Sequence, residues 1–140
     1  MTAQFTPPKA DDTTRLASQW LSASRLVEEE CGRALTQSLD DLMQIQRLLD
    51  EDVVDRSGYA LQCLGVALGR VMARNIDGLD WWIVEDEYGR DPCLRYRETT
   101  LRLNPITMIS RRIERGERVD VRSLYRESEA SIAKLKDDVD

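Results

Sequence analysis

Histidine is absent from this 140-residue sequence, and cysteine, lysine and phenylalanine are scarce. Without histidine the chain has no Ser-His or Cys-His nucleophile, no histidine-ligated metal and no ordinary general base at neutral pH. The three cysteines, Cys31, Cys63 and Cys93, are widely separated and include no C-x-x-C pair, so they predict neither a closed disulfide framework nor a four-ligand zinc site. We therefore expect no enzyme activity, no cofactor and an inert buried thiol at Cys63.

Long apolar runs are also missing, because no stretch approaches the roughly 20 apolar residues of a membrane-spanning helix. The first residues lack the basic-then-apolar pattern of a secretory signal, and two prolines and two aspartates indicate a flexible lead-in over residues 1–12. The expectation is a cytoplasmic protein without membrane contact, with residues 13–140 as a single domain.

Acidic residues outnumber basic ones, 26 to 20, for a net charge of −6, which does not favour nucleic acid as a partner. The charges are unevenly distributed: residues 1–89 carry 8 basic and 16 acidic groups, whereas residues 90–126 carry 10 arginines and 5 acidic groups. Arginine forms planar, bidentate contacts, so this block indicates either a recognition surface or pairing with the acidic half of the same chain.

Apolar residues at three- and four-residue steps predict helices over residues 13–31, 35–49 and 57–75, with Asp55 or Ser57 as a cap for the third. The third is apolar on most sides and belongs in the middle of the fold. Its Gly65 and Gly69 lie on one face, a spacing that favours close approach of another backbone.

After residue 80 the apolar period changes to two, which predicts short strands near residues 81–84, 93–97 and 100–103. Asn104 and Pro105 then predict the start of a helix that Gly116 ends, and Asp120 caps a last one. The predicted fold class is α+β, with three N-terminal helices, a three-stranded antiparallel meander and two C-terminal helices. The candidate exposed surface comprises Trp82, Arg95, Arg97 and Arg102.

Carboxylates gather around the predicted hairpin, and arginines follow on the next helix. Three interpretations remain open: an internal ion-pair network, a surface that recognises a protein or ligand, or hard oxygen ligands for a divalent metal. The residues of this acidic hairpin cluster are Glu85, Asp86, Glu87, Arg90, Asp91, Arg111 and Arg112.

The segment from Leu42 to Tyr125 resembles a family of small bacterial proteins, the domain of unknown function 3806. Its most specific parts are Glu-Asp-Glu-Tyr-Gly-Arg-Asp-Pro over residues 85–92 and the block from Pro105 to Gly116. The resemblance implies a shared fold and a bacterial cytoplasmic setting, and it brings no catalytic residues.

Small size, acidity and the missing catalytic groups favour a non-enzymatic protein-binding module, of the immunity or regulatory partner type, that acts as a monomer or weak homodimer. One alternative is a small-ligand or metal-binding domain that uses the acidic hairpin. A further alternative is a type III secretion chaperone, although three leading helices fit its usual element order less well.

Overall fold

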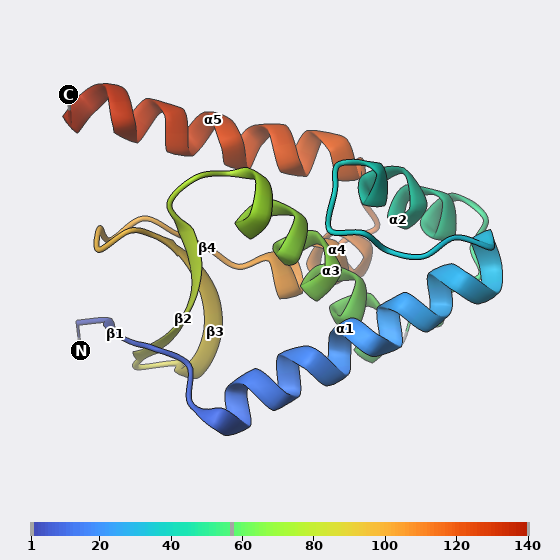
Figure 1. Cartoon of the computed structure of the whole chain (residues 1–140), viewed down its shortest axis with the longest axis horizontal. Coiled ribbons are helices and arrows are strands. Elements are labelled where there is room, and N and C mark those ends of the chain that lie inside the picture. The colour runs from blue at the N-terminus through green and yellow to red at the C-terminus, as the bar shows by residue number, and fades with distance from the viewer. Residues whose placement is uncertain (1, 57, 140) are drawn as a thin grey trace.

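The computed structural model describes residues 2–56 and 58–139. Within them the chain forms five helices and four strands, and helices α1 to α4 lie on one side of an antiparallel sheet (Figure 1). The α+β class predicted from the sequence is therefore confirmed. The elements in chain order are β1 (Gln4–Thr6), α1 (Ala10–Cys31), α2 (Asp40–Asp50), α3 (Tyr59–Asn75), β2 (Leu79–Asp86), β3 (Gly89–Tyr96), β4 (Arg102–Leu103), α4 (Pro105–Glu114) and α5 (Val121–Val139).

The sheet has four strands in the order β1-β2-β3-β4. The three predicted strands correspond to β2, β3 and β4, and the predicted strand number is wrong because β1 adds a fourth. Strand β1 pairs antiparallel with β2, with Phe5 opposite Val84. The expected flexible lead-in does not hold here either, because residues 4–6 form this strand and residues 10–12 form the first turn of α1. A three-residue strand is too short to show an alternating pattern, and the prolines after it resemble a linker.

Strands β2 and β3 form a hairpin whose register runs from Leu79 opposite Tyr96 to Asp86 opposite Gly89. Paired residues of an antiparallel sheet point to the same face, so this register sorts the side chains. Trp81 and Leu94 lie on the inner face, towards the helices, whereas Trp82 lies on the outer face. As the two-sided apolar pattern predicted, β2 is an internal strand.

Helix α3 occupies the centre of the molecule and contacts α1, α2, α4, α5 and β2. Its apolar residues are almost all buried, which confirms the central position expected from its sequence. The helix begins at Tyr59 after Gly58, and Ser57, one of the two predicted caps, lies outside the described residues.

The glycines of α3 allow α4 and β2 to pack against it, as their spacing predicted. A Cβ atom at Gly65 would clash with the carbonyl oxygen of Ile106 and would lie 2.6 Å from that of Pro105. At Gly69 the added atom would lie 2.7 Å from the Trp81 ring and 2.8 Å from the Pro105 ring. These distances are far below van der Waals contact, so a methyl group at either position forces a neighbouring group to move: backbone at Gly65 and side chains at Gly69.

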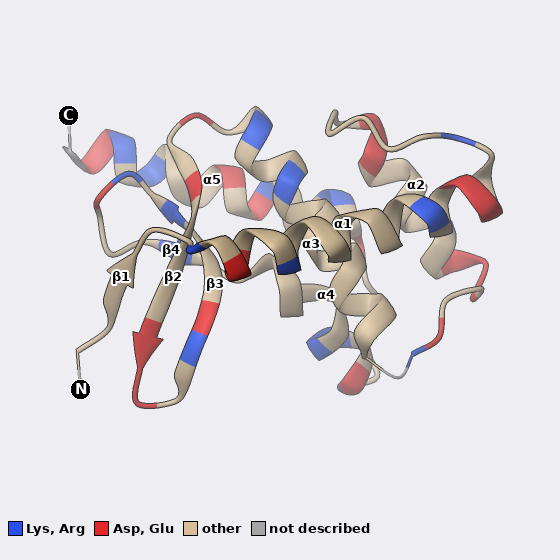
Figure 2. Ribbon diagram, turned by 60° about the horizontal axis from the view of Figure 1, so that its bottom comes forward, with Lys and Arg blue, Asp and Glu red and all other residues tan. Residues whose placement is uncertain are grey.

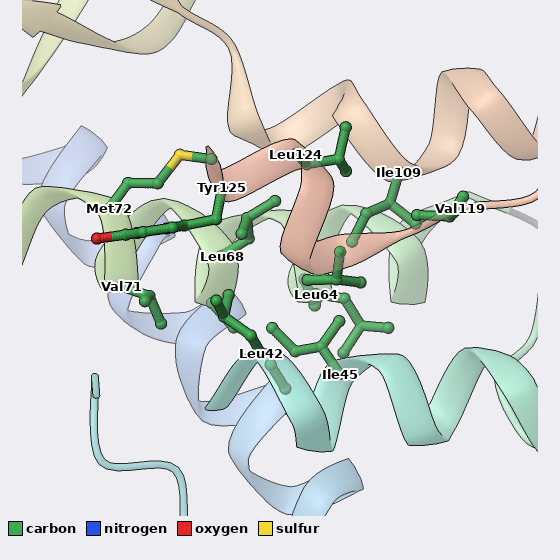
Figure 3. Close-up of a cluster of buried hydrophobic side chains, with 14 of the residues drawn as sticks. Leu42, Ile45, Leu64, Leu68, Val71, Met72, Ile109, Val119, Leu124 and Tyr125 are labelled. Carbon is green, nitrogen blue, oxygen red and sulfur yellow. The ribbon is translucent and has the colours of Figure 1, made fainter. Parts of the chain in front are cut away.

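A continuous apolar core joins α2, α3, α4 and α5 (Figure 3). Gln46 of α2 adds a polar link to the start of α5: its Nε2 donates to the Val119 carbonyl at 3.0 Å, and its Oε1 accepts from the Val121 N–H at 2.8 Å. Asp120 accepts from the Ser123 N–H at 3.1 Å, which confirms it as the cap of α5.

The segment between α1 and α2 is held by a buried carboxylate. Gly32 ends α1 in the left-handed conformation, with φ 66°, as a helix-terminating glycine does. Asp41, 1% exposed, then accepts from the backbone N–H groups of Thr36 and Gln37 at 2.9 and 2.7 Å. The buried charge is thereby satisfied, and the loop returns to α2 in a fixed position.

Across residues 2–56 and 58–139, no helix combines the length and the apolar character that crossing a membrane requires.

Candidate functional site

The tip of the β2–β3 hairpin concentrates charge of both signs. Figure 2 shows acidic residues at the end of β2 and residues of both signs on the adjoining part of β3. The turn itself is Glu87 and Tyr88, both exposed, and Asp86 accepts from the Tyr88 N–H at 2.9 Å. Glu85, also exposed, faces Arg90 across the strand pair.

Arg90 does not pair with another member of the acidic hairpin cluster but with Asp12 at the start of α1. Its two terminal nitrogens donate to the two Asp12 oxygens at 2.8 Å each, a bidentate contact. Asp12 also accepts from the Lys9 N–H at 2.9 Å. The Arg90 contact first, and the Lys9 contact second, hold the pKa of the Asp12 carboxyl well below its usual range.

Asp86 pairs with Arg102 of β4, at 3.4 Å, with side chains 19% and 32% exposed. Arg112 instead donates to the Met108 carbonyl of its own helix at 3.0 Å. Among the described residues no ion pair joins Arg111 or Arg112 to the hairpin carboxylates, so the predicted network between hairpin and α4 is not the one formed.

The outer face of the sheet carries a stack of side chains in place of the free basic surface that was expected. The Arg95 guanidinium lies 4.2 Å from the Phe5 ring centroid and 4.6 Å from the Trp82 ring centroid. It also donates to the carbonyls of Thr99 at 2.7 Å and Glu98 at 2.8 Å. Trp82, Arg95 and Arg102 are half-buried, and of the four predicted surface residues Arg97 is the exposed one among those described.

A cleft of about 570 Å³ opens between the hairpin, α1, the start of α3 and α4, and we call it the hairpin cleft. Of the acidic hairpin cluster and the candidate exposed surface, it brings together Asp86, Asp91, Arg102 and Arg111. The other predicted site residues do not line it: Trp82, Glu85, Glu87, Arg90, Arg95, Arg97 and Arg112. The lining residues are Arg15, Gln19, Tyr59, Gln62, Val84, Asp86, Tyr88, Asp91, Pro92, Arg102, Asn104, Ile106, Thr107 and Arg111.

The cationic groups of the hairpin cleft are incompletely satisfied. The side chains of Arg15 and Arg111 are exposed and form no ion pair or hydrogen bond within residues 2–56 and 58–139. The Nη1 atom of Arg102 is buried and also lacks a hydrogen-bond partner in the part of the chain that the structure describes. Arginines in this condition retain donors for an external acceptor.

Two tyrosines stand at the rim of the hairpin cleft. Tyr88 is 88% exposed at the hairpin tip, and Tyr59 is 58% exposed at the first turn of α3. Asn104 also lines the cleft, and in the described structure its side chain makes no hydrogen bond that caps α4. Tyrosine and arginine are the residue types enriched where protein surfaces bind partners.

Two further kinds of site were considered in the described residues: clusters of metal-ligating side chains and free cysteine thiols. The described residues contain no group of three or more histidine, cysteine, aspartate or glutamate side chains placed to hold a metal ion. Cys63 and Cys93 are fully buried, and burial raises the pKa of both thiols, that of Cys93 to about 11. The burial predicted for Cys63 is therefore confirmed, and a thiol with a raised pKa is a poor nucleophile.

Comparison with known proteins identifies the central part of the chain. Residues 41–125 match the family described as Domain of unknown function (DUF3806). The chain belongs to this family. The DUF3806 segment runs from the start of α2 to the first turns of α5, so it contains every predicted site residue. Curated proteins offer no match to the sequence.

A solved structure shares the fold beyond the DUF3806 segment. The chain resembles a crystal structure from Bacteroides thetaiotaomicron VPI-5482, with a TM-score of 0.84 at 15% sequence identity. The likeness covers 91% of this chain and 47% of that chain, so this chain spans about half the length of its structural neighbour. At this identity the likeness establishes the fold.

Several residues that line the hairpin cleft were not predicted as functional from the sequence. Arg15 and Gln19 lie outside the DUF3806 segment, four residues apart on α1, where Arg15 resembles an ordinary exposed helix residue. Outside the cleft lining, Asp12, the partner of Arg90, was expected in a flexible lead-in. Tyr59, at the first turn of a buried helix, could have been noticed as an aromatic residue outside the apolar stripe.

Proposed function

We propose that this protein is a non-enzymatic binding module that docks an acidic segment of a partner protein in the hairpin cleft. The observation that carries the proposal is that Arg15 and Arg111, which lack a carboxylate partner among the described residues, share one cleft with the exposed rings of Tyr59 and Tyr88.

The charge of the hairpin cleft favours an acidic segment over a basic one. Its lining holds Arg15, Arg102 and Arg111 against Asp86 and Asp91, and Asp86 is already paired with Arg102. The two exposed arginines therefore present donors, whereas one carboxylate, Asp91, remains to oppose them. A cationic site in a chain of net charge −6 is a local feature, so it supports a specific contact rather than general electrostatic attraction.

The rim supports a protein partner over a small solute. An exposed tyrosine gains hydrophobic contact and a hydrogen bond when a partner covers it, and it loses little side-chain entropy. Tyr88 lies at the tip of a two-residue turn and is 88% exposed, so a peptide segment that extends from the cleft along the hairpin would cover it. In this proposal the module acts in the cytoplasm as a monomer or weak homodimer, as an immunity or regulatory partner.

Photo-crosslinking in cells tests the proposal and captures the partner in the same experiment. The photoreactive residue p-benzoylphenylalanine replaces Tyr88 in the full chain, and the crosslinked segment is mapped by mass spectrometry. We expect an acidic segment of another protein, with crosslinking reduced about tenfold or more by Arg15→Gln together with Arg111→Gln, since each charged contact contributes on the order of 1–3 kcal/mol.

The matched control for the charge change is Arg33→Gln, because Arg33 is also exposed and lies away from the hairpin cleft. It should leave crosslinking unchanged. Crosslinks to segments without acidic residues, or crosslinks that survive the loss of both cleft arginines, would overturn the proposal.

A further inference from the structure

A second cavity of about 370 Å³ lies on the other side of α1 from the hairpin cleft, and we call it the α1–α3 pocket. Helix α1 contributes Thr13 and Leu16 to this pocket, and Arg15 and Gln19 to the hairpin cleft. Helix α3 supplies Arg70, and β2 supplies Trp81 from its inner face. The volume lies in the range of pockets that hold small molecules.

The lining of the α1–α3 pocket combines apolar and cationic residues. Pro8, Leu16, Ala73 and Trp81 form apolar surface, whereas Arg70 and Arg74 contribute guanidinium groups. No carboxylate belongs to the described lining residues. The two arginines are four residues apart on one helix face, where like charges repel and destabilise the helix.

Arg70 is an unusual cation for its position. Its guanidinium is half-buried and stacks at 4.8 Å from the Trp20 ring centroid, and over the described chain it forms no ion pair or hydrogen bond. Burial, with no opposing contribution from a carboxylate, lowers the pKa of this guanidinium. A partly buried charge without a counter-ion is costly, and an anion placed beside it would recover that free energy.

We propose that the α1–α3 pocket binds a small organic anion, a carboxylate or phosphate group carried on an apolar or aromatic body. The anionic group lies between Arg70 and Arg74, and the body packs on Trp81 and Leu16. Arginine suits this role because its planar fork matches the oxygens of both groups. The two repelling cations and the adjacent apolar wall together define this class of ligand.

This site is independent of the partner-binding role proposed for the hairpin cleft. The two cavities have no lining residue in common. A variant that disrupts one cavity therefore leaves the lining of the other intact, and binding to each can be measured separately. The failure of either proposal does not affect the other.

The test is a titration of the full chain followed by backbone amide chemical shifts. The probes are phenyl phosphate and benzoate, with inorganic phosphate and phenol as the two halves of the ligand tested separately. We expect saturable shifts at residues 70–74 with phenyl phosphate or benzoate, and binding weaker by about tenfold or more for either half alone. Whichever of phenyl phosphate and benzoate binds more tightly identifies the anionic group.

Variants assign the binding to the pocket. Arg70→Gln with Arg74→Gln should weaken binding by about tenfold or more, whereas Arg25→Gln, an exposed arginine of α1 away from the pocket, should leave it unchanged. If the arginine variant fails to fold, Ala73→Leu occupies the pocket and keeps both arginines, and it should abolish binding. Absence of saturable shifts at millimolar probe, or equal binding in the wild type and Ala73→Leu, would overturn the proposal.

Discussion

The α3–α4 contact and the β2–β3 hairpin are held by different kinds of interaction. At Gly65 the helix backbone meets the backbone carbonyls of α4 with no room for a methyl group. The hairpin pairs with β1 and β4 through the backbone, and the contacts at its tip and outer face are made by side chains: Arg90 reaches Asp12, Asp86 reaches Arg102, and Arg95 stacks on Phe5 and Trp82. Backbone contact cannot adapt, whereas long charged side chains can rearrange when a partner binds. The contact that tolerates least change thus lies between α3 and α4, and the exposed donors and rings of the proposed docking site gather beside the hairpin.

The largest effect is expected from Gly65→Ala. The new methyl group would overlap the carbonyl oxygens of Ile106 and Pro105, so α4 must move away from α3. We expect the free energy of unfolding to fall by about 3 kcal/mol or more, measured by chemical denaturation. Gly69→Ala is the comparison variant, because its methyl group meets the side chains of Trp81 and Pro105, which can shift. A loss at Gly65 no larger than that at Gly69 would contradict the backbone contact.

A smaller effect is expected from Arg95→Gln. The change removes the guanidinium between Phe5 and Trp82 and its two bonds to the Thr99 and Glu98 carbonyls. We expect a loss of about 1–2 kcal/mol in the free energy of unfolding. Arg97→Gln is the matched control, because Arg97 is exposed and its pair with Asp77 spans 3.7 Å. That control should change stability by less than about 0.5 kcal/mol.

The difference between Arg95 and Arg97 also marks the limit of prediction from sequence. Alternation of residue types placed Arg95 and Trp82 on the outer face, and the structure confirms that placement. Alternation does not reveal that β1 brings Phe5 beside them, since strand pairing between residues 4–6 and 83–85 is a long-range contact with no local signal. The burial of Arg95 and the pairing of Asp12 with Arg90 depend on long-range strand and helix contacts, which the local sequence does not reveal. The central position of α3, the close contact at its glycines and the hairpin turn could be predicted from the local sequence pattern.

The pair between Asp12 and Arg90 predicts a dependence of stability on pH. The folded-state pKa of Asp12 is lowered from its ordinary value of 3.8, so the carboxylate is stabilised by folding. This contribution is fully present above the unfolded-state pKa and is lost as the pH falls through the lower, folded-state value. Arg90→Gln should therefore be less stable than the wild type near neutral pH, and the difference should shrink as the pH falls below about 4. Unfolding by denaturant across this range measures it, and a difference independent of pH would contradict the pairing.

The smallest effect concerns which arginine Asp86 pairs with. One of the interpretations open from the sequence is an internal ion-pair network between the hairpin carboxylates and the arginines of the following helix, Arg111 and Arg112. In the structure Arg112 donates a hydrogen bond to the Met108 carbonyl of its own helix. Asp86 forms its ion pair with Arg102 of β4. The pair is partly exposed and 3.4 Å apart, so its coupling should be modest.

Double-mutant cycles separate the two pairings. Asp86→Asn combined with Arg102→Gln should give a coupling free energy of about 0.5–1 kcal/mol, and Asp86→Asn combined with Arg112→Gln should give a value near zero. The Arg102 coupling should also weaken in high salt, because the pair is accessible to screening ions. Coupling to Arg112 that exceeds coupling to Arg102 would mean that α4 secures the hairpin tip through its charges. In that case the arginines of α4 would be engaged within the molecule, and the hairpin cleft would have fewer free donors for an acidic partner than we propose.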